Sequence, residues 1–233
     1  MDKNIKDCIK EELLGWKMWE VVWFVTACTA ILALSLYWND SVMGIISATS
    51  GVACVVCTGK GKLSAYFFGA VNTLLYAIIA YRAQFYGEVM LNVLYYFPMQ
   101  FYGMYVWSRH MNEETHEVGK KTMKPRGKVL LYTSVIGATI LYGLLLQRMG
   151  GALPFIDALS TVVSVFAMVI SVRMYAEQWI LWIVVDVVTV VMWGIAFARG
   201  NDSIATLLMW VVYLGNAVVM YVKWIREAKA NEV

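Results

Sequence analysis

Long apolar runs alternate with short polar breaks along almost the entire chain. Read with a window of about 19 residues, the sequence contains runs that are long enough, or nearly so, to cross about 30 Å of hydrocarbon as helices. The predicted membrane-spanning helices are 19–37, 41–58, 64–81, 90–107, 129–146, 155–172, 179–197 and 204–222. Turn or charge signals separate them, and the shortest separation is the break at Asn39 and Asp40. The pattern therefore predicts an all-α integral membrane protein with eight transmembrane helices.

The basic residues are distributed unevenly between the two sides of these helices. If both chain ends lie on one side, only Arg82, Arg148 and Arg199, of 19 Lys and Arg residues in all, fall on the opposite side. Lys and Arg are retained in short cytoplasmic loops, so we expect both termini in the cytoplasm. A plan of seven or nine helices would scramble this alternation.

A weak internal repeat suggests how the helices are organised. An offset of the sequence against itself that places Asn72 on Asp186 also places Tyr96 on Trp210, and it moves the second to fourth helices onto the sixth to eighth. Because that step spans an even number of crossings, the two helical triplets would have the same orientation, as in transporters built from parallel repeats. The alternative is a chance likeness of two apolar stretches.

The repeat predicts five regions along the chain. Residues 1–40 hold a cytoplasmic tail and an extra N-terminal helix, 41–108 the first three-helix repeat, and 109–147 a basic cytoplasmic loop with a linker helix. Residues 148–223 form the second three-helix repeat, and 224–233 form a cytoplasmic tail.

Composition excludes an ordinary soluble enzyme. Of 233 residues, 61% are hydrophobic and 15% charged, whereas soluble domains are about half apolar and a quarter charged. The net charge of +3 predicts no nucleic-acid partner, and zinc-protease, nucleophile-elbow and P-loop motifs are missing, so we do not expect an enzyme. The C-x-x-C pair of Cys54 and Cys57 lies in an apolar run without a second pair, which predicts helix packing and neither a metal nor a cofactor.

Asp186 is the acidic residue nearest to the middle of a predicted span. An ionisable group there costs at least a few kcal/mol, and no Lys or Arg lies as deep, so Asp186 is protonated, hydrogen-bonded internally or paired with a ligand. Trp182 lies one turn before it, and an indole face beside a carboxylate can hold a flat cation. Trp179 lies on the same face of this helix as Trp182 and Asp186. Because it is the first residue of the predicted span, we expect it in the belt of aromatic residues at the membrane interface. A neutral structural aspartate is the alternative.

Other polar and aromatic residues within the spans are candidates for the same site. The amides of Asn72, Gln100 and Asn216 donate and accept hydrogen bonds, which suits the hydroxyls of a sugar, although bonds between helices would explain them equally well. For Ser164 the interhelical bond is the favoured interpretation. The full set of candidate substrate-binding residues is Trp182, Asp186, Asn72, Gln100, Asn216, Tyr76, Tyr213 and Ser164.

Several local sequences resemble those of the PnuC-type nicotinamide riboside transporters of bacterial inner membranes. They are Tyr66-Phe-Phe-Gly-Ala-Val-Asn72, Tyr86-Gly-Glu88, Pro98-Met-Gln100, Phe155-Ile-Asp157 and the Trp-Ile-Leu-Trp-Ile-Val-Val-Asp run that ends at Asp186. The resemblance extends over nearly the whole chain. It implies a three-one-three helix plan similar to that of SWEET sugar transporters, preceded here by the extra N-terminal helix, and a multi-pass protein of the inner membrane.

The resemblance also implies a substrate and a mode of transport. Nicotinamide riboside, a flat pyridinium cation on a ribose, would enter by facilitated diffusion and be trapped by a cytoplasmic ribosylnicotinamide kinase. Trp182 would stack on the ring, Asp186 would balance its charge or bind a hydroxyl, and the amides would bind the ribose or the carboxamide. No deep Lys or Arg is present to bind a phosphate, which favours the nucleoside over the mononucleotide. The family also suggests a homotrimer.

Two alternatives to this function remain open. The first is a transporter of another vitamin or nucleoside, such as thiamine, because a fold does not determine its cargo. The second is a membrane-embedded receptor that binds its ligand without translocating it.

Overall fold

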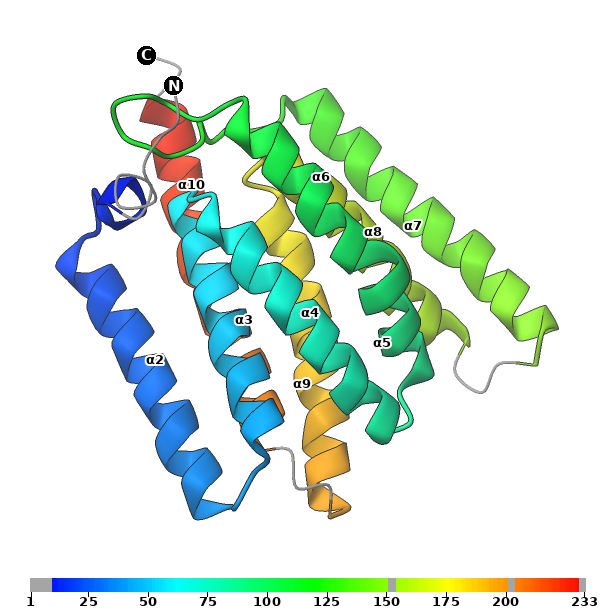
Figure 1. Cartoon of the computed structure of the whole chain (residues 1–233). Coiled ribbons are helices and arrows are strands. Elements are labelled where there is room, and N and C mark those ends of the chain that lie inside the picture. Colours follow the sequence, from blue (N-terminus) through cyan, green and yellow to red (C-terminus); the bar gives the residue numbers. More distant parts are fainter. Residues whose placement is uncertain (1–9, 151–153, 201–203, 231–233) are drawn as a thin grey trace.

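Helices make up most of the computed structural model, which describes residues 10–150, 154–200 and 204–230 (Figure 1). Within these ranges, seven helices are long and apolar enough to cross a membrane. They are α2 (Met18–Tyr37), α3 (Val42–Lys60), α4 (Ser64–Arg82), α7 (Pro125–Arg148), α8 (Pro154–Val172), α9 (Gln178–Ala198) and α10 (Ile204–Ala230). The predicted all-helical membrane protein is confirmed.

The helix expected at 90–107 is present, but it changes its hydrogen-bond register. Three segments follow one another without a break: α5 (Tyr86–Met90), the π-helix η1 (Leu91–Tyr96) and α6 (Phe97–Ser108). Pro98 lies at the start of α6, and a proline cannot donate the backbone hydrogen bond that a regular helix needs there. The wider π-turns end just before it, and such turns are frequent at functional sites. The apolar pattern predicts the helix but not this change of register.

The expected break at Asn39 and Asp40 is a true helix boundary. Asn39 has a left-handed φ of 54°, and the Ser41 side chain then caps α3 by accepting the N–H of Gly44 at 3.0 Å. At the other end of α3, Gly61 has a φ of 86°, and its N–H donates to the Cys57 carbonyl at 2.9 Å, as is typical of a glycine that ends a helix.

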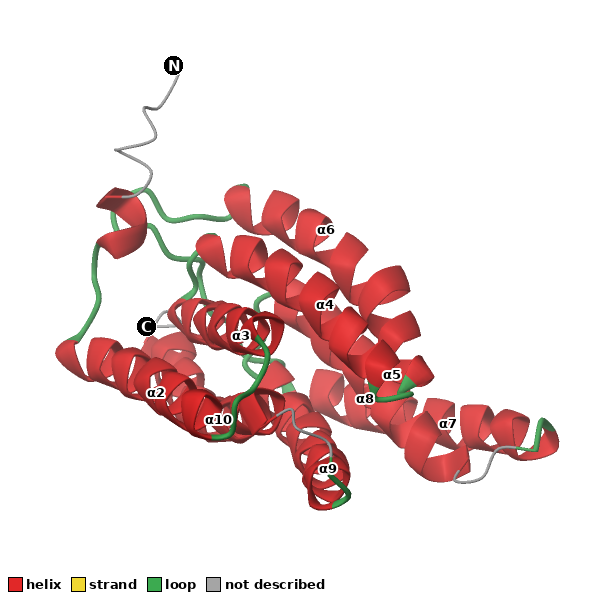
Figure 2. Ribbon diagram, turned by 60° about the horizontal axis from the view of Figure 1, so that its bottom comes forward, coloured by secondary structure: helices red, strands yellow, loops and turns green. Residues whose placement is uncertain are grey.

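Six helices form a ring, if η1 and α6 are counted as one continuous helix (Figures 1 and 2). Contacts run from α3 to α4, to η1 and α6, to α8, to α9 and to α10, and α10 returns to α3. α2 packs on the outside of α3 and α10, and α7 packs on the outside of α8, at opposite sides of the molecule. The ring therefore consists of the helices that the sequence assigns to the two repeats.

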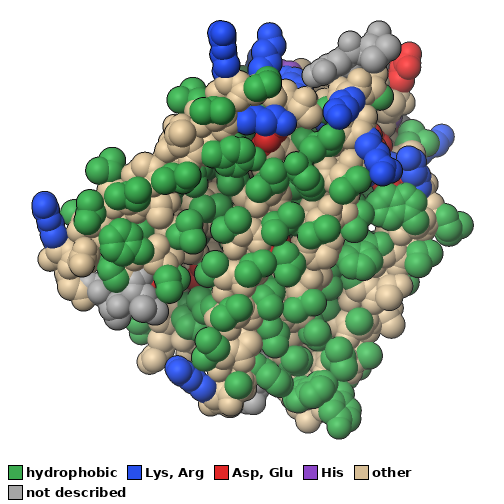
Figure 3. Space-filling view, turned by 180° about the vertical axis from the view of Figure 1, so that it is seen from behind, with side chains coloured by type: hydrophobic (Ala, Val, Ile, Leu, Met, Phe, Trp, Pro, Cys, Tyr) green, Lys and Arg blue, Asp and Glu red, His purple; other side chains and the backbone are tan. Residues whose placement is uncertain are grey.

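The outer surface matches a lipid environment. Apolar side chains cover the face shown in Figure 3, and most Lys and Arg side chains gather at its upper end. Leu36 on α2 is 71% exposed, and Leu141 on α7 is 72% exposed. Contiguous apolar surface of this extent marks contact with a membrane or a partner, so the outer helices suit the hydrocarbon core of a bilayer.

Loop 109–124 lies across the end of the ring at which α3 and α10 end. The N–H of Val118 donates to the Gly61 carbonyl at 3.0 Å, and the N–H of Lys121 donates to the Met174 carbonyl at 3.0 Å. Glu117 pairs with Lys120 at 2.7 Å. Burial raises the pKa of Glu117, but Lys120 and other neighbouring charges lower it more, so this pKa lies below its ordinary value. The loop therefore joins the turn between α3 and α4 to the turn between α8 and α9.

Candidate ligand-binding site

A cavity lies inside the ring of six helices. The space between its walls, with the open space at its mouth included, is about 900 Å³. Side chains from α3, α4, η1, α6, α8, α9 and α10 line it. The wall is mostly apolar and aromatic, with a few polar groups, as in sites that bury a drug-sized ligand.

Most of the predicted site residues meet in this cavity. Those that line it are Trp182, Asp186, Asn72, Gln100, Tyr76 and Tyr213. Asn216 and Ser164 are fully buried but do not line it. The amide of Asn216 instead donates to the Val55 carbonyl of α3 at 3.1 Å, which is the interhelical bond that the alternative interpretation predicted. Ser164 lies within α8 and is not one of the residues that line the cavity.

Asp186 provides the one acidic side chain among the described residues of the cavity wall. It lies near the middle of α9 and is 2% exposed. No described residue donates a hydrogen bond to its carboxylate or forms an ion pair with it. A buried carboxylate without a partner is either protonated or neutralised by a ligand, so of the three alternatives only the internally bonded one lacks support among the described residues. A cationic ligand would supply the missing partner.

Trp179, Trp182 and Asp186 all face the cavity, as their spacing by three and four residues on one helix predicts. The ring of Trp182 lies 6.1 Å from the ring of Tyr96, with 46° between their planes. Trp179 is only 2% exposed, so its predicted place in the interfacial belt is wrong. It packs edge-on against Trp224, with 5.7 Å between the ring centroids. One face of α9 thus presents two indoles and a carboxylate to the cavity.

Helices of both predicted repeats hold Asn72 in place. Its amide nitrogen donates to the Ser47 carbonyl of α3 at 2.8 Å, and the hydroxyl of Tyr213 on α10 donates to its amide oxygen at 3.3 Å. Gly51 makes room for this pair, because a Cβ there would lie 2.0 Å from the Tyr213 hydroxyl. The Asn72 side chain is therefore fixed in orientation before any ligand binds.

Gln100 lies on α6 against the backbone of Gly69 on α4. A Cβ at Gly69 would lie 2.5 Å from Oε1 of Gln100. Gln100 is 7% exposed, and its amide has no hydrogen-bond partner among the described residues. An amide offers both donors and an acceptor, so Gln100 can bind a hydroxyl or another amide.

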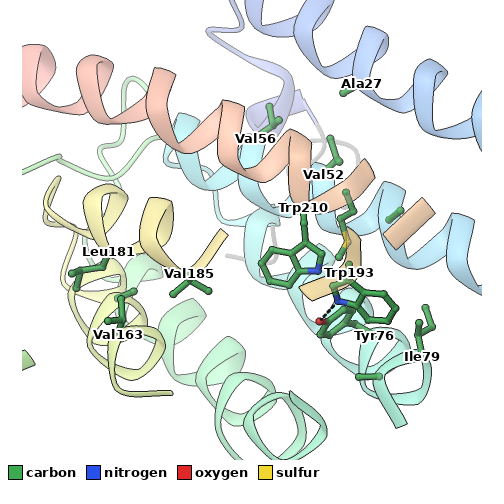
Figure 4. Packing of buried hydrophobic residues seen from close by; sticks show 14 of the residues in the cluster. Ala27, Val52, Val56, Tyr76, Ile79, Val163, Leu181, Val185, Trp193 and Trp210 are labelled. Carbon is green, nitrogen blue, oxygen red and sulfur yellow. Dashed lines mark hydrogen bonds between the residues drawn. The ribbon is translucent and has the colours of Figure 1, made fainter. Parts of the chain in front are cut away.

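Tyr76 is an aromatic residue of the cavity lining. It is 2% exposed, and the indole N–H of Trp193 donates to its hydroxyl at 2.9 Å (Figure 4). The ring of Trp210 packs against it with 5.6 Å between the centroids, at 68°. These contacts fix the ring of Tyr76, which therefore gives the cavity a rigid aromatic surface.

Three hydrogen-bond donors of the cavity are not among the predicted site residues. The hydroxyl of Tyr66 and the indole N–H groups of Trp179 and Trp210 are buried, line the cavity and have no partner among the described residues. None of them is polar enough to stand out within an apolar span. The repeat offers a signal for Trp210, because the offset pairs it with Tyr96 and both residues line the cavity. An indole N–H needs an acceptor, which a hydroxyl or carbonyl of a ligand can supply.

These features define a class of protein. A ring of helices with an apolar outer surface encloses a cavity, and its wall holds a carboxylate without a partner among the described residues. A ligand site enclosed by helices within the membrane is an architecture of membrane transporters.

Comparison with known proteins identifies the family within this class. A family model described as nicotinamide mononucleotide transporter matches residues 41–226. The nicotinamide riboside transporter PnuC of Neisseria mucosa is 39% identical over 228 residues, which cover 95% of this chain and 87% of that protein. Its counterpart in Haemophilus influenzae is 32% identical over 224 residues, which cover 95% and 96%. A crystal structure of the vitamin B3 transporter PnuC superposes with a TM-score of 0.88 at 36% identity and covers 98% of this chain and 99% of that one.

The chain therefore belongs to the PnuC family of transporters. It is a multi-pass membrane protein and not an enzyme.

Proposed function

We propose that this protein takes up nicotinamide riboside across the bacterial inner membrane by facilitated diffusion. The observation that carries the proposal is the buried, unpaired carboxylate of Asp186 in an aromatic cavity. Nicotinamide riboside carries one positive charge on a flat ring, and both the carboxylate and the indole faces attract such a charge. The names of the relatives from Neisseria mucosa and Haemophilus influenzae support the same substrate.

The cavity suggests a role for each of its polar groups. In our proposal, the pyridinium ring stacks on Trp182, and Asp186 balances its charge. Gln100, whose amide is unpaired among the described residues, binds the ribose or the carboxamide, and Asn72 accepts a bond from a hydroxyl. Tyr76 and Tyr213 shape the walls.

The same wall distinguishes the riboside from the mononucleotide, which the description of the matching family model names. No Lys or Arg is found among the described residues that line the cavity. A phosphate would enter this cavity without a cation to bind it, and Asp186 would repel it. We therefore propose that the protein transports the nucleoside only when its ribose carries no phosphate.

We further propose the membrane arrangement that the sequence predicts. α2 is the extra span, α3 to α6 and α8 to α10 are parallel triplets, α7 links them, and both termini face the cytoplasm. The bias of Lys and Arg supports this orientation, and two pairs aligned by the repeat support the triplets, because Asn72 and Asp186 both line the cavity, as do Tyr96 and Trp210. The homotrimer and the coupling to a kinase stay predictions.

Uptake into liposomes that contain the purified protein tests this function. We expect labelled nicotinamide riboside to accumulate until its concentration inside equals that outside, without an ion gradient. Unlabelled nicotinamide riboside should compete, whereas the mononucleotide and thiamine should not. Stronger competition by thiamine would assign a different substrate. Saturable binding without entry into the lumen would assign a receptor.

Trp182→Ala should lower the affinity for nicotinamide riboside about tenfold, because a cation over an indole face that is shielded from water is worth roughly 1–2 kcal/mol. Isothermal titration calorimetry in detergent measures this change. Trp182→Phe should retain more of the affinity, since it keeps an aromatic face, and Trp38→Ala, which removes a tryptophan that is 44% exposed, should have no effect. Equal affinities for all four proteins would place the ring elsewhere.

A further inference from the structure

The two predicted repeats meet along two lines of the ring. α3 packs against α10 along the first, which we call the α3/α10 seam, and η1 and α6 pack against α8 along the second, the α6/α8 seam. α2 lies over the α3/α10 seam and contacts both of its helices (Figures 1 and 2). α2 therefore covers the α3/α10 seam and not the α6/α8 seam.

At one end of α2, Glu20 binds both helices of the α3/α10 seam. Its carboxylate pairs with Lys60 of α3 at 3.0 Å and with Lys223 of α10 at 2.6 Å. It also accepts the N–H of Lys17 at 2.9 Å, which caps α2. The side chain of Glu20 is 2% exposed, and those of the two lysines are 5% and 10% exposed. Separating the helices here would leave buried charges unpaired, which is costly.

Asp40, in the link between α2 and α3, also binds both helices of the α3/α10 seam. One carboxylate oxygen accepts the N–H of Ser41 at 2.6 Å, directly before α3. The other accepts the N–H of Ala205 at 2.8 Å, in the first turn of α10. The first N–H groups of a helix have no partner within the helix, and a carboxylate there is stabilised by the helix dipole. One aspartate thus joins the N-termini of helices from different repeats.

Near the Glu20 end the α3/α10 seam is also closely packed. The indole N–H of Trp224 donates to the Gly59 carbonyl at 2.8 Å, and a Cβ at Gly59 would lie 2.5 Å from the sulfur of Met220. The α6/α8 seam contains the hydroxyl of Tyr95, which donates to the Val165 carbonyl at 2.8 Å. No ion pair among the described residues joins α6 directly to α8. The α6/α8 seam is therefore held by neutral bonds, which are the weaker kind.

We propose that α2 is a brace that keeps the α3/α10 seam closed at both membrane faces, with Glu20 and Asp40 as its positioning residues. The two repeats then part along the α6/α8 seam. This inference rests on the proposed function in so far as transport requires the repeats to move against each other, but it does not depend on which substrate is carried.

Distances between pairs of spin labels, measured across each seam in lipid vesicles, test whether α2 keeps the α3/α10 seam closed. Spin labels are attached to exposed positions, Ile46→Cys with Val211→Cys for the α3/α10 seam and Leu94→Cys with Ile156→Cys for the α6/α8 seam. The native cysteines are replaced by serine, and double electron–electron resonance gives the distances. We expect a single narrow distance across the α3/α10 seam and more than one distance across the α6/α8 seam. Two distances at the α3/α10 seam, or a single one at the α6/α8 seam, would overturn the proposal.

The double variant Glu20→Gln with Asp40→Asn should add a second, longer distance across the α3/α10 seam. It should also slow uptake while the equilibrium affinity for nicotinamide riboside stays unchanged, which a general loss of structure would not do. Glu113→Gln and Asp157→Asn are the matched controls, because these exposed carboxylates lie at the same two ends of the molecule; they should leave both seams unaltered. An unchanged α3/α10 distance in the folded double variant would refute the role of the two carboxylates.

Uptake by the unlabelled wild-type protein is measured in parallel. If it takes up no nicotinamide riboside, the proposed function fails, yet the distances across the two seams still decide the proposal about α2. If the double variant does not fold, the wild-type distances alone decide it.

Discussion

Asp186→Asn is expected to lower the affinity for nicotinamide riboside about a hundredfold, because removing one partner of a buried charge pair costs about 2–5 kcal/mol. The substitution keeps the size and shape of the side chain, so the cavity should keep its volume. What is lost is the negative charge, in a wall that holds no other acidic side chain among the described residues. Isothermal titration calorimetry and liposome uptake measure the loss.

A neutral ligand and a distant carboxylate serve as controls for this prediction. The 1,4-dihydro form of nicotinamide riboside has a similar shape but no positive charge, so it should bind the wild-type protein and Asp186→Asn with similar affinity. Asp157→Asn, at an exposed position in the first turn of α8, should bind the cation as the wild type does. If Asp186→Asn also retained full affinity for the cation, the charge of the ligand would be balanced elsewhere.

Gly51→Ala is expected to reduce uptake by more than about tenfold, because overpacking a core costs about 1–3 kcal/mol. The new methyl group would lie 2.0 Å from the hydroxyl of Tyr213 and 2.7 Å from the amide nitrogen of Asn72. Both side chains line the cavity, so either displacement changes the site directly. The initial rate of uptake into liposomes gives the effect.

Gly194→Ala is the matched control for Gly51→Ala. It also adds a methyl group to a helical glycine, but no atom lies within 4 Å of the new Cβ. We expect normal uptake, with a small gain in stability because alanine favours the helix. A folded Gly51→Ala protein that transports at the wild-type rate would show that the pair of Asn72 and Tyr213 tolerates displacement.

The apolar pattern predicted the helices well because a span in lipid must be both long and apolar. Even the two-residue break at Asn39 and Asp40 marks a boundary, since Asn39 takes a left-handed turn. The π-turns of η1 were not predicted. They depend on how the chain before Pro98 packs against α4 and α8, and a hydropathy window contains no such information.

Much of the cavity lining could be predicted from the polar residues within the spans. Placing a polar side chain in lipid costs free energy, so such residues usually have a structural or functional role. The same criterion selected Asn72, which lines the cavity, and Asn216, which does not. The two side chains are equally polar, and the direction that each faces around its helix separates them. That direction is set by the packing of helices far apart in sequence.

The role of Glu20 was missed for a similar reason. In sequence it is an acidic residue in the first turn of a span, a common and unremarkable position. Its partners Lys60 and Lys223 are distant along the chain. The ion pairs exist only because α2 lies across α3 and α10.

The bonds that fix Asn72 also decide what a ligand meets at that wall. Its amide nitrogen is engaged with Ser47, so the oxygen is the part of the amide left for a ligand, next to the hydroxyl of Tyr213. In the proposed complex, this oxygen, the carboxylate of Asp186 and the faces of the indole rings would face an electron-poor ligand, which agrees with the proposed cationic substrate.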